Sequence, residues 1–121
     1  MSLDVAFATY LNTLGDAYDE KLPREGATYP ALVYTLVLED HQPPLDGSSY
    51  VQIETLYQVT IFAPTKTAAR AIARQIESDR SGVVGTLNGV AICNCQVQIA
   101  GEANDQDENL KSVIVEVRFF Q

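Results

Sequence analysis

The stretch from Val51 to Asp79 constrains the fold more than any other part of the sequence. Apolar or β-forming side chains recur at every second residue from Val51 to Ile61, as expected for one face of a β-strand. Pro64 then ends the strand, because its nitrogen carries no hydrogen for a ladder bond. Residues 65–79 are rich in helix formers. The pattern predicts a long strand that leads directly into an amphipathic helix.

Small apolar side chains define the face that this helix turns toward the sheet. The predicted end of the helix is at Ser81-Gly82. The side chains predicted to be buried are Ala68, Ala69, Ile72, Ala73 and Ile76.

A second amphipathic helix is predicted at the N-terminus, from Leu3 to Leu14. Its apolar residues recur at spacings of three, four and seven, and Gly15 is a plausible C-cap. The following segment, Asp16 to Thr28, is polar and reads as a connection that holds a short strand at Ala17 to Asp19.

A strand is predicted from Ala31 to Leu38, with Leu32, Tyr34, Leu36 and Leu38 sharing one face. Both of its faces are largely apolar, which predicts a central strand covered on both sides. Residues 39–49 contain strong breakers and predict an unusually long hairpin loop, of the kind that often makes contacts.

The C-terminal third is predicted to be mostly strand. From Val90 onward the alternation favours burial of Ala91, Cys93, Cys95, Val97 and Ile99, and Asn88-Gly89 is a turn or a bulge. Residues 101–109 form a predicted acidic loop. The final strand, residues 110–120, would place Val113, Val115, Val117 and Phe119 in the core.

The predicted order of elements is therefore α-β-β-α-β-β within a single domain spanning residues 1–121. Because the strands come in hairpin-like pairs, we expect an α+β fold with a mainly antiparallel sheet and two helices packed against it.

Charge and hydropathy exclude several classes of function. The net charge of -8 disfavours a nucleic-acid-binding surface, which needs clustered Lys and Arg. No apolar run approaches the roughly 20 residues needed to cross a bilayer. The first residues lack the basic region of a signal peptide, so we expect a cytoplasmic protein without membrane association.

Candidate chemistry is sparse. His41 is the only histidine; with Glu39 and Asp40 it could bind a metal, but we favour a solvated loop because no second cluster completes a ligand shell. Residues 104–108 place oxygens at alternate positions but lack the central glycine and distant glutamate of a calcium loop. The two cysteines, Cys93 and Cys95, are expected to be reduced. No catalytic motif is present, so we expect neither an enzyme nor a cofactor.

Several segments together resemble the tail completion, or tail terminator, family of long-tailed bacteriophages and prophages. The resemblance lies in the entry into the first long strand (residues 22–34), the loop at residues 45–47, the strand-to-helix junction (residues 57–65) and the last strand (residues 116–120). It extends over nearly the whole chain and rests on the order and spacing of these segments.

The resemblance implies a structural role rather than a reaction. Members of that family form a homo-oligomeric ring, commonly a hexamer, that ends growth of the tail tube and joins the tail to the head connector. The implied partners are further copies of the chain, the tail tube protein and the head-tail connector protein. The implied locations are the cytoplasm of a bacterial host during assembly and the tail of the virion.

The residues proposed to face a neighbouring subunit or the channel come from two acidic loops and from tyrosines near the first hairpin, since Tyr is favoured at interfaces. They are Asp40, His41, Asp46, Tyr50, Tyr57, Glu102, Asp105, Asp107 and Glu108. Two alternatives stay open: a small cytoplasmic enzyme or ligand-binding α+β domain, and a homologue from a contractile injection device.

Overall fold

The computed structural model describes residues 3–19, 30–42, 52–82, 85–87, 89–92, 94–105 and 110–121. These residues form two α-helices and seven β-strands. The elements are α1 (Leu3–Leu11), β1 (Asp16–Asp19), β2 (Ala31–Gln42), β3 (Gln52–Ala63), α2 (Lys66–Arg80), β4 (Gly85–Leu87), β5 (Val90–Ile92), β6 (Asn94–Asp105) and β7 (Leu110–Phe120).

The main sheet has five strands in the order β1-β2-β3-β7-β6. The pairs β2-β3, β3-β7 and β7-β6 are antiparallel, and only the short β1 runs parallel to its neighbour β2. β4 and β5 form a separate small hairpin, with Gly89 at a φ of 88° in its turn. The predicted α+β fold with a mainly antiparallel sheet is confirmed.

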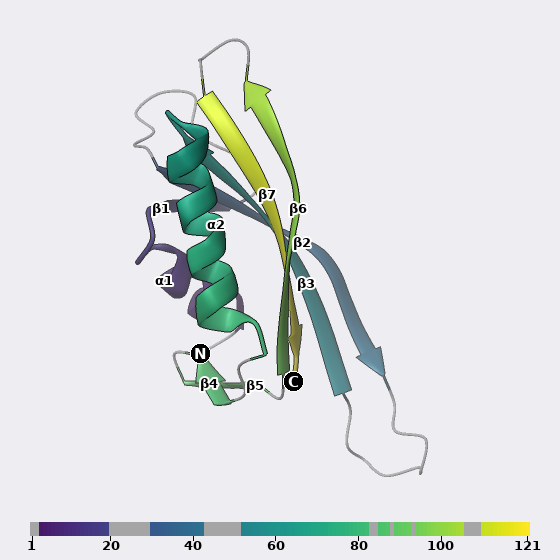
Figure 1. Ribbon diagram of the computed structural model, residues 1–121. Coiled ribbons are helices and arrows are strands. Elements are labelled where there is room, and N and C mark those ends of the chain that lie inside the picture. Colours follow the sequence, from purple (N-terminus) through teal and green to yellow (C-terminus); the bar gives the residue numbers. More distant parts are fainter. Residues whose placement is uncertain are drawn as a thin grey trace.

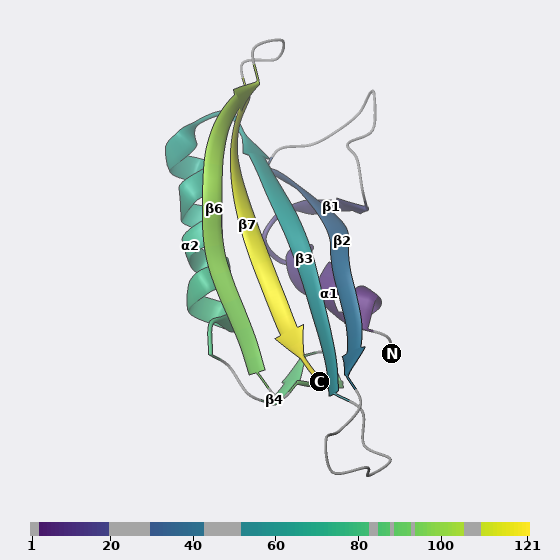
Figure 2. The ribbon, with the colours of Figure 1, turned by 90° about the vertical axis from the view of Figure 1, so that its right-hand side faces the viewer.

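Both helices lie on one face of this sheet (Figure 1). When the molecule is turned by 90°, the sheet faces the viewer with both helices behind it, α2 beside β6 and α1 behind β2 and β3 (Figure 2). The core fills the space between helices and sheet. Its centre is Phe7 of α1. The centroid of the Phe7 ring lies 4.8 Å from the ring centroid of Tyr57 and 5.2 Å from that of Phe119.

Helix α2 begins as the sequence predicts. Thr65 is the N-cap, and its hydroxyl accepts a hydrogen bond from the backbone N–H of Ala68 at 3.2 Å. Ala69, Ala73 and Ile76 are buried, as expected for residues spaced four and three apart on one helical face. Ala68 was predicted to be buried as well, but it is exposed, since it lies outside that face.

Helix α1 ends at Leu11, three residues before the predicted Leu14. The side chain of Asn12 explains the early end. Its amide nitrogen donates to the carbonyl of Ala8 at 3.0 Å, and its oxygen accepts from the N–H of Ala17 at 3.1 Å. After Leu11 the backbone bonds shorten to three-residue spacing, from Thr13 to Tyr10 and from Leu14 to Leu11, and the Asn12 side chain links the end of the helix to β1.

A β-bulge in β2 changes which side chains share a face. Leu36 pairs with Tyr57 and Leu38 pairs with Leu56, so Val37 is an extra residue. Leu36 and Leu38 therefore lie on opposite faces, and the prediction that they share one was wrong. The prediction that β2 is covered on both sides was also wrong for the described part of the chain, because both helices lie on the same side.

Two hairpins extend farther than the sequence suggests. β2 continues to Gln42 and β6 continues to Asp105, each into a segment predicted to be loop. The residues of these two strand ends are mostly polar and show no apolar alternation, so they gave no strand signal. The predicted face of residues 90–92 was also wrong: Val90 and Ile92 are buried while Ala91 is exposed, and the burial pattern shifts between β5 and β6.

Candidate interaction surface

The face of the sheet opposite the helices is the first candidate surface; we call it the bare face. No described helix or strand covers it (Figure 2). Several of its large apolar side chains are only partly buried, which is unusual for side chains that alternate with a core. They are Leu56, Phe62, Ile114 and Phe120.

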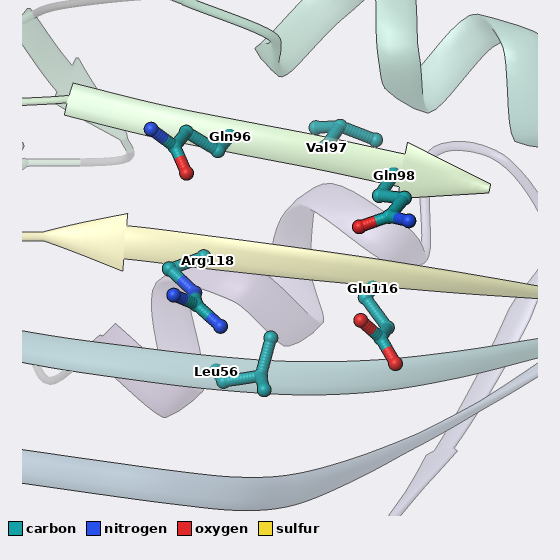
Figure 3. A pocket seen from close by; sticks show the side chains of 6 residues that line it. All are labelled: Leu56, Gln96, Val97, Gln98, Glu116 and Arg118. Atoms are coloured by element: carbon teal, nitrogen blue, oxygen red, sulfur yellow. The ribbon is translucent and has the colours of Figure 1, made fainter. Parts of the chain in front are cut away.

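A shallow depression of about 250 Å³ lies on the bare face, across β3, β7 and β6. Figure 3 shows side chains from these three strands around it. Its lining combines two amides, one carboxylate, one guanidinium and two apolar side chains. The residues are Leu56, Gln96, Val97, Gln98, Glu116 and Arg118.

An ion pair crosses the bare face. The Arg118 guanidinium lies 2.9 Å from a carboxylate oxygen of Glu54, and the Arg118 side chain remains 40% exposed. Pairs with this much solvent contact contribute about 0–1 kcal/mol. The pair therefore orients the Arg118 side chain more than it stabilises the fold.

The outer edge of β2 is the second candidate surface. β1 covers this edge only as far as Tyr34, which pairs with Asp19. Beyond that point no described strand pairs with it, so residues 35–42 form what we call the β2 free edge. The bulge lies within this edge, and three consecutive apolar side chains there are exposed: Leu36 by 47%, Val37 by 55% and Leu38 by 41%.

A second depression, of about 200 Å³, lies on the helix side of the β2 free edge. Asp4, Asp19, Tyr34, Leu36 and Tyr57 line it. The Tyr57 hydroxyl donates a hydrogen bond to the Asp4 carboxylate. Burial, followed by that hydrogen bond, raises the pKa of Tyr57 above its usual value, and burial also raises the pKa of Tyr34. Both phenols therefore stay neutral donors at neutral pH and are unsuited to act as bases.

Among the residues proposed from the sequence, Asp40 and His41 are exposed on β2 itself rather than in a loop. The His41 Nε2 lies 3.7 Å from a carboxylate oxygen of Glu39. Asp40 points to the opposite face of the strand, since side chains alternate. The three residues thus do not converge as metal ligands would.

The other proposed residues fall into two groups. Tyr57 is 1% exposed and belongs to the core, so its ring packs on Phe7 rather than facing a partner. Glu102 and Asp105 are in the β6 ladder, opposite Val113 and Leu110 of β7. The remaining residues lie outside the described part of the chain. They are Asp46, Tyr50, Asp107 and Glu108.

Within the described residues, no group of three His, Cys, Asp or Glu side chains is placed to hold a metal ion. Cys95 is buried, and burial raises the pKa of its thiol to about 11, which makes it unreactive at neutral pH. Cys93 is outside the described residues. None of the described helices combines the length and the apolar character needed to cross a membrane.

Two features of this surface were missed from the sequence: the bulge at Val37 and the lack of cover over β2 on the bare face. The one available signal was the double-sided apolar character of residues 31–38. This pattern predicted that both faces of the strand are covered, but the described elements cover only one of them.

Comparison with known proteins gives a fold and no sequence family. No family model matches the chain, and no curated protein sequence matches it. A chain in the virion of a native gene transfer agent particle has a similar fold, with a TM-score of 0.59 and 13% identity over 98% of this chain and 85% of that chain. A second solved structure, of a protein known by an identifier alone, has a TM-score of 0.66 and 14% identity, over 100% of this chain and 96% of that one. At these identities the likeness concerns the fold.

Proposed function

We propose that this chain is a structural component of a phage-like virion and acts as a tail terminator. In this role it forms a homo-oligomeric ring, which we propose to be a hexamer. The ring ends growth of the tail tube and provides the surface on which the head connector docks. Its partners are other copies of itself, the tail tube protein and the connector protein. It is made in the bacterial cytoplasm and ends in the tail of the particle.

The observation that carries this proposal is the fold shared with a chain of a gene transfer agent virion over 98% of the present chain. Such agreement over the full domain, at only 13% identity, supports a common architecture. The order of the segments that resemble tail terminators supports the same assignment from the sequence. The net charge of -8 suits a ring through which DNA passes without binding.

The surface favours assembly over catalysis. An enzyme would need a pocket in which polar groups converge with a titrating group poised near neutral pH. The two depressions described above are small, and the pKa shifts found near them keep tyrosines protonated. By contrast, three neighbouring exposed apolar residues on a strand edge are typical of a surface that another chain covers. We therefore propose a non-catalytic role.

Light scattering after size-exclusion chromatography, at low and high protein concentration, tests the proposal together with negative-stain images of the same fractions. We expect closed rings of a single size. Isolated tail tubes provide a second assay, in which the protein should bind one end of the tube and stop its extension. A protein that forms no ring and leaves tube extension unchanged would contradict the proposed function.

A further inference from the structure

We infer that neighbouring copies join head to tail, with the β2 free edge of one copy paired antiparallel to the outer edge of β6 in the next. This inference rests on the proposed ring and specifies its contact. The outer edge of β6 comprises residues 94–105, because β6 pairs with β7 alone and no described strand lies on its other side. Among the described strands, the β2 free edge and the outer edge of β6 thus lack a partner strand, and they lie on opposite sides of the sheet (Figure 2).

Exposed strand edges offer rows of unpaired N–H and C=O groups that readily pair with another strand. Here the two edges belong to different strands, so each contact would join the β2 free edge of one copy to the β6 edge of another. Every copy would then keep its second edge for a further copy, and the contact could be repeated. Contacts of that kind generate rings when the rotation between copies closes. Two copies related by a two-fold axis would pair two identical edges, either β2 with β2 or β6 with β6, and would leave the other kind of edge unpaired.

The direction of the strands fits this arrangement. Three antiparallel steps, from β2 to β3, to β7 and to β6, make β6 antiparallel to β2 within one copy. A rotation about an axis along the strands keeps the direction of each strand unchanged in every copy. The β6 strand of one copy would therefore meet the β2 strand of the next in the antiparallel direction, the more stable form of pairing.

The register also places the two edges at the same level. Leu38 pairs with Leu56, Leu56 with Arg118, and Arg118 with Gln96, which makes one row across the sheet. The next row on the same face runs from Thr35 to Gln98 through the same strands. The β2 free edge thus lies opposite the first half of β6, where pairing would cover the exposed apolar residues at the bulge.

Charge on the helix side is complementary between the two edges. Helix α2, next to β6, carries four cationic side chains against two carboxylates. The cations are Lys66, Arg70, Arg74 and Arg80. The described residues of α1, β1 and β2 carry no Lys or Arg. Their carboxylates on the helix side are those of Asp4, Asp19 and Glu39.

The geometry brings these charges to the same side of the sheet. Asp4 and Asp19 line the depression on the helix side of the β2 free edge. Because α2 lies on this side too, edge pairing would place the α2 helix of one copy beside the Asp4 and Asp19 carboxylates of the next (Figures 1 and 2). Arg74, exposed on α2, is the guanidinium we assign to face them. Complementary charge of this kind selects the partner and fixes its register.

A cysteine pair tests the edge contact directly. Leu38→Cys and Gln96→Cys are introduced into one chain together with Cys93→Ser, which leaves Cys95 as the other thiol, itself buried. Under mild oxidation we expect a ladder of disulfide-linked oligomers that ends at the size of the ring. The control chain carries Leu38→Cys with Thr86→Cys, whose second site is on β4, and should yield no ladder.

Charge reversal tests the α2 contact without altering either strand. Asp19→Lys and Arg74→Glu should each raise the concentration needed for half assembly by about tenfold or more, and the double variant should restore it, since like charges at a contact are costly. Lys111→Glu, the same kind of reversal on the central strand β7, should leave assembly unchanged.

The outcomes separate this inference from the proposed function. If rings form but the cysteines at positions 38 and 96 do not crosslink, and neither charge reversal weakens assembly, the edge contact is overturned. The terminator role would then remain intact. A protein that neither crosslinks nor assembles, alone or on tail tubes, would overturn both. A crosslinked ladder with rescue by the double reversal supports the edge contact and the ring together.

Discussion

The two faces of the main sheet are built from the same strands yet have different surroundings. On the helix side, Phe7, Tyr57 and Phe119 are almost completely buried and their rings are in contact. On the bare face, Leu56 and Phe120, each a neighbour in sequence of one of these residues, stay partly exposed. The comparison teaches that apolar alternation alone does not identify the face that forms the core. The face that receives the helices forms the core of the chain, and no described helix covers the other face.

The largest expected difference between the faces comes from two adjacent phenylalanines of β7. Phe119→Ala should lower the free energy of unfolding by about 3–5 kcal/mol, because it empties a closely packed site. Phe120→Ala should cost less than half as much, since its side chain already contacts solvent. Urea denaturation of the isolated protein measures both. Equal losses would mean that the two faces are equally packed.

Thiol reactivity gives the second comparison. With a pKa of about 11, the Cys95 thiol should react with iodoacetamide at pH 8 roughly a hundredfold more slowly than an ordinary thiol. A cysteine introduced by Gln96→Cys, on the opposite face of β6, should react at the ordinary rate. Fast labelling of Cys95 in the folded protein would show that the helix side is open.

The same shift predicts how stability depends on pH. Since folding raises the pKa of Cys95 from 9.0 to about 11, the folded state binds this proton more tightly than the unfolded state does. The resulting stabilisation is fully present below pH 9 and is lost as the pH rises through about 11. The unfolding free energy of the native protein should therefore fall more steeply over this interval than that of Cys95→Ala.

A buried hydroxyl gives the third comparison. Thr55 is 2% exposed, and its Oγ1 has no hydrogen-bond partner among the described residues. Thr55→Val keeps the shape and removes the unsatisfied group, so we expect a gain of about 1 kcal/mol in unfolding free energy. Thr60→Val, on the bare face of the same strand, should change stability by less than about 0.5 kcal/mol. A loss of stability in Thr55→Val would mean that the hydroxyl has a partner.

The smallest effect is expected at the ion pair of the bare face. Arg118→Ala should lower the unfolding free energy by about 0.5 kcal/mol, because the Arg118 side chain is 40% exposed. Addition of 1 M salt should remove the difference between this variant and the native protein, as screening weakens exposed pairs. A loss that persists in salt would mean that packing of the Arg118 side chain, rather than its charge, stabilises the face.

The parts of the fold that the sequence predicted well are those that bury one regular face. β3, α2 and β7 have clear periods, and their core residues, such as Val59, Ala73 and Val115, are buried as expected. The bulge at Val37 could not be predicted, because it depends on pairing with β3 and leaves no local signature. The ends of β2 and β6 were missed because polar strand ends resemble loops in sequence.

The candidate surface was predicted less well than the fold. An interface depends on which edges and faces stay uncovered after folding, and that information lies in the order of the strands rather than in any short motif. The order β1-β2-β3-β7-β6 leaves part of the outer edge of β2 and the whole outer edge of β6 unpaired among the described strands. Tyr57 illustrates the limit: its residue type suits an interface, but its position in the core decides its role.

The bulge at Val37 also constrains how the gene for this chain can change over time. Side chains alternate regularly before and after this residue, and the phase resets only there. Loss of the Val37 codon would give an unbroken alternation in which Leu36 still faces the helices, Leu38 the bare face and Glu39 the helices. A single in-frame deletion could thus remove the bulge and straighten β2 without exchanging its two faces.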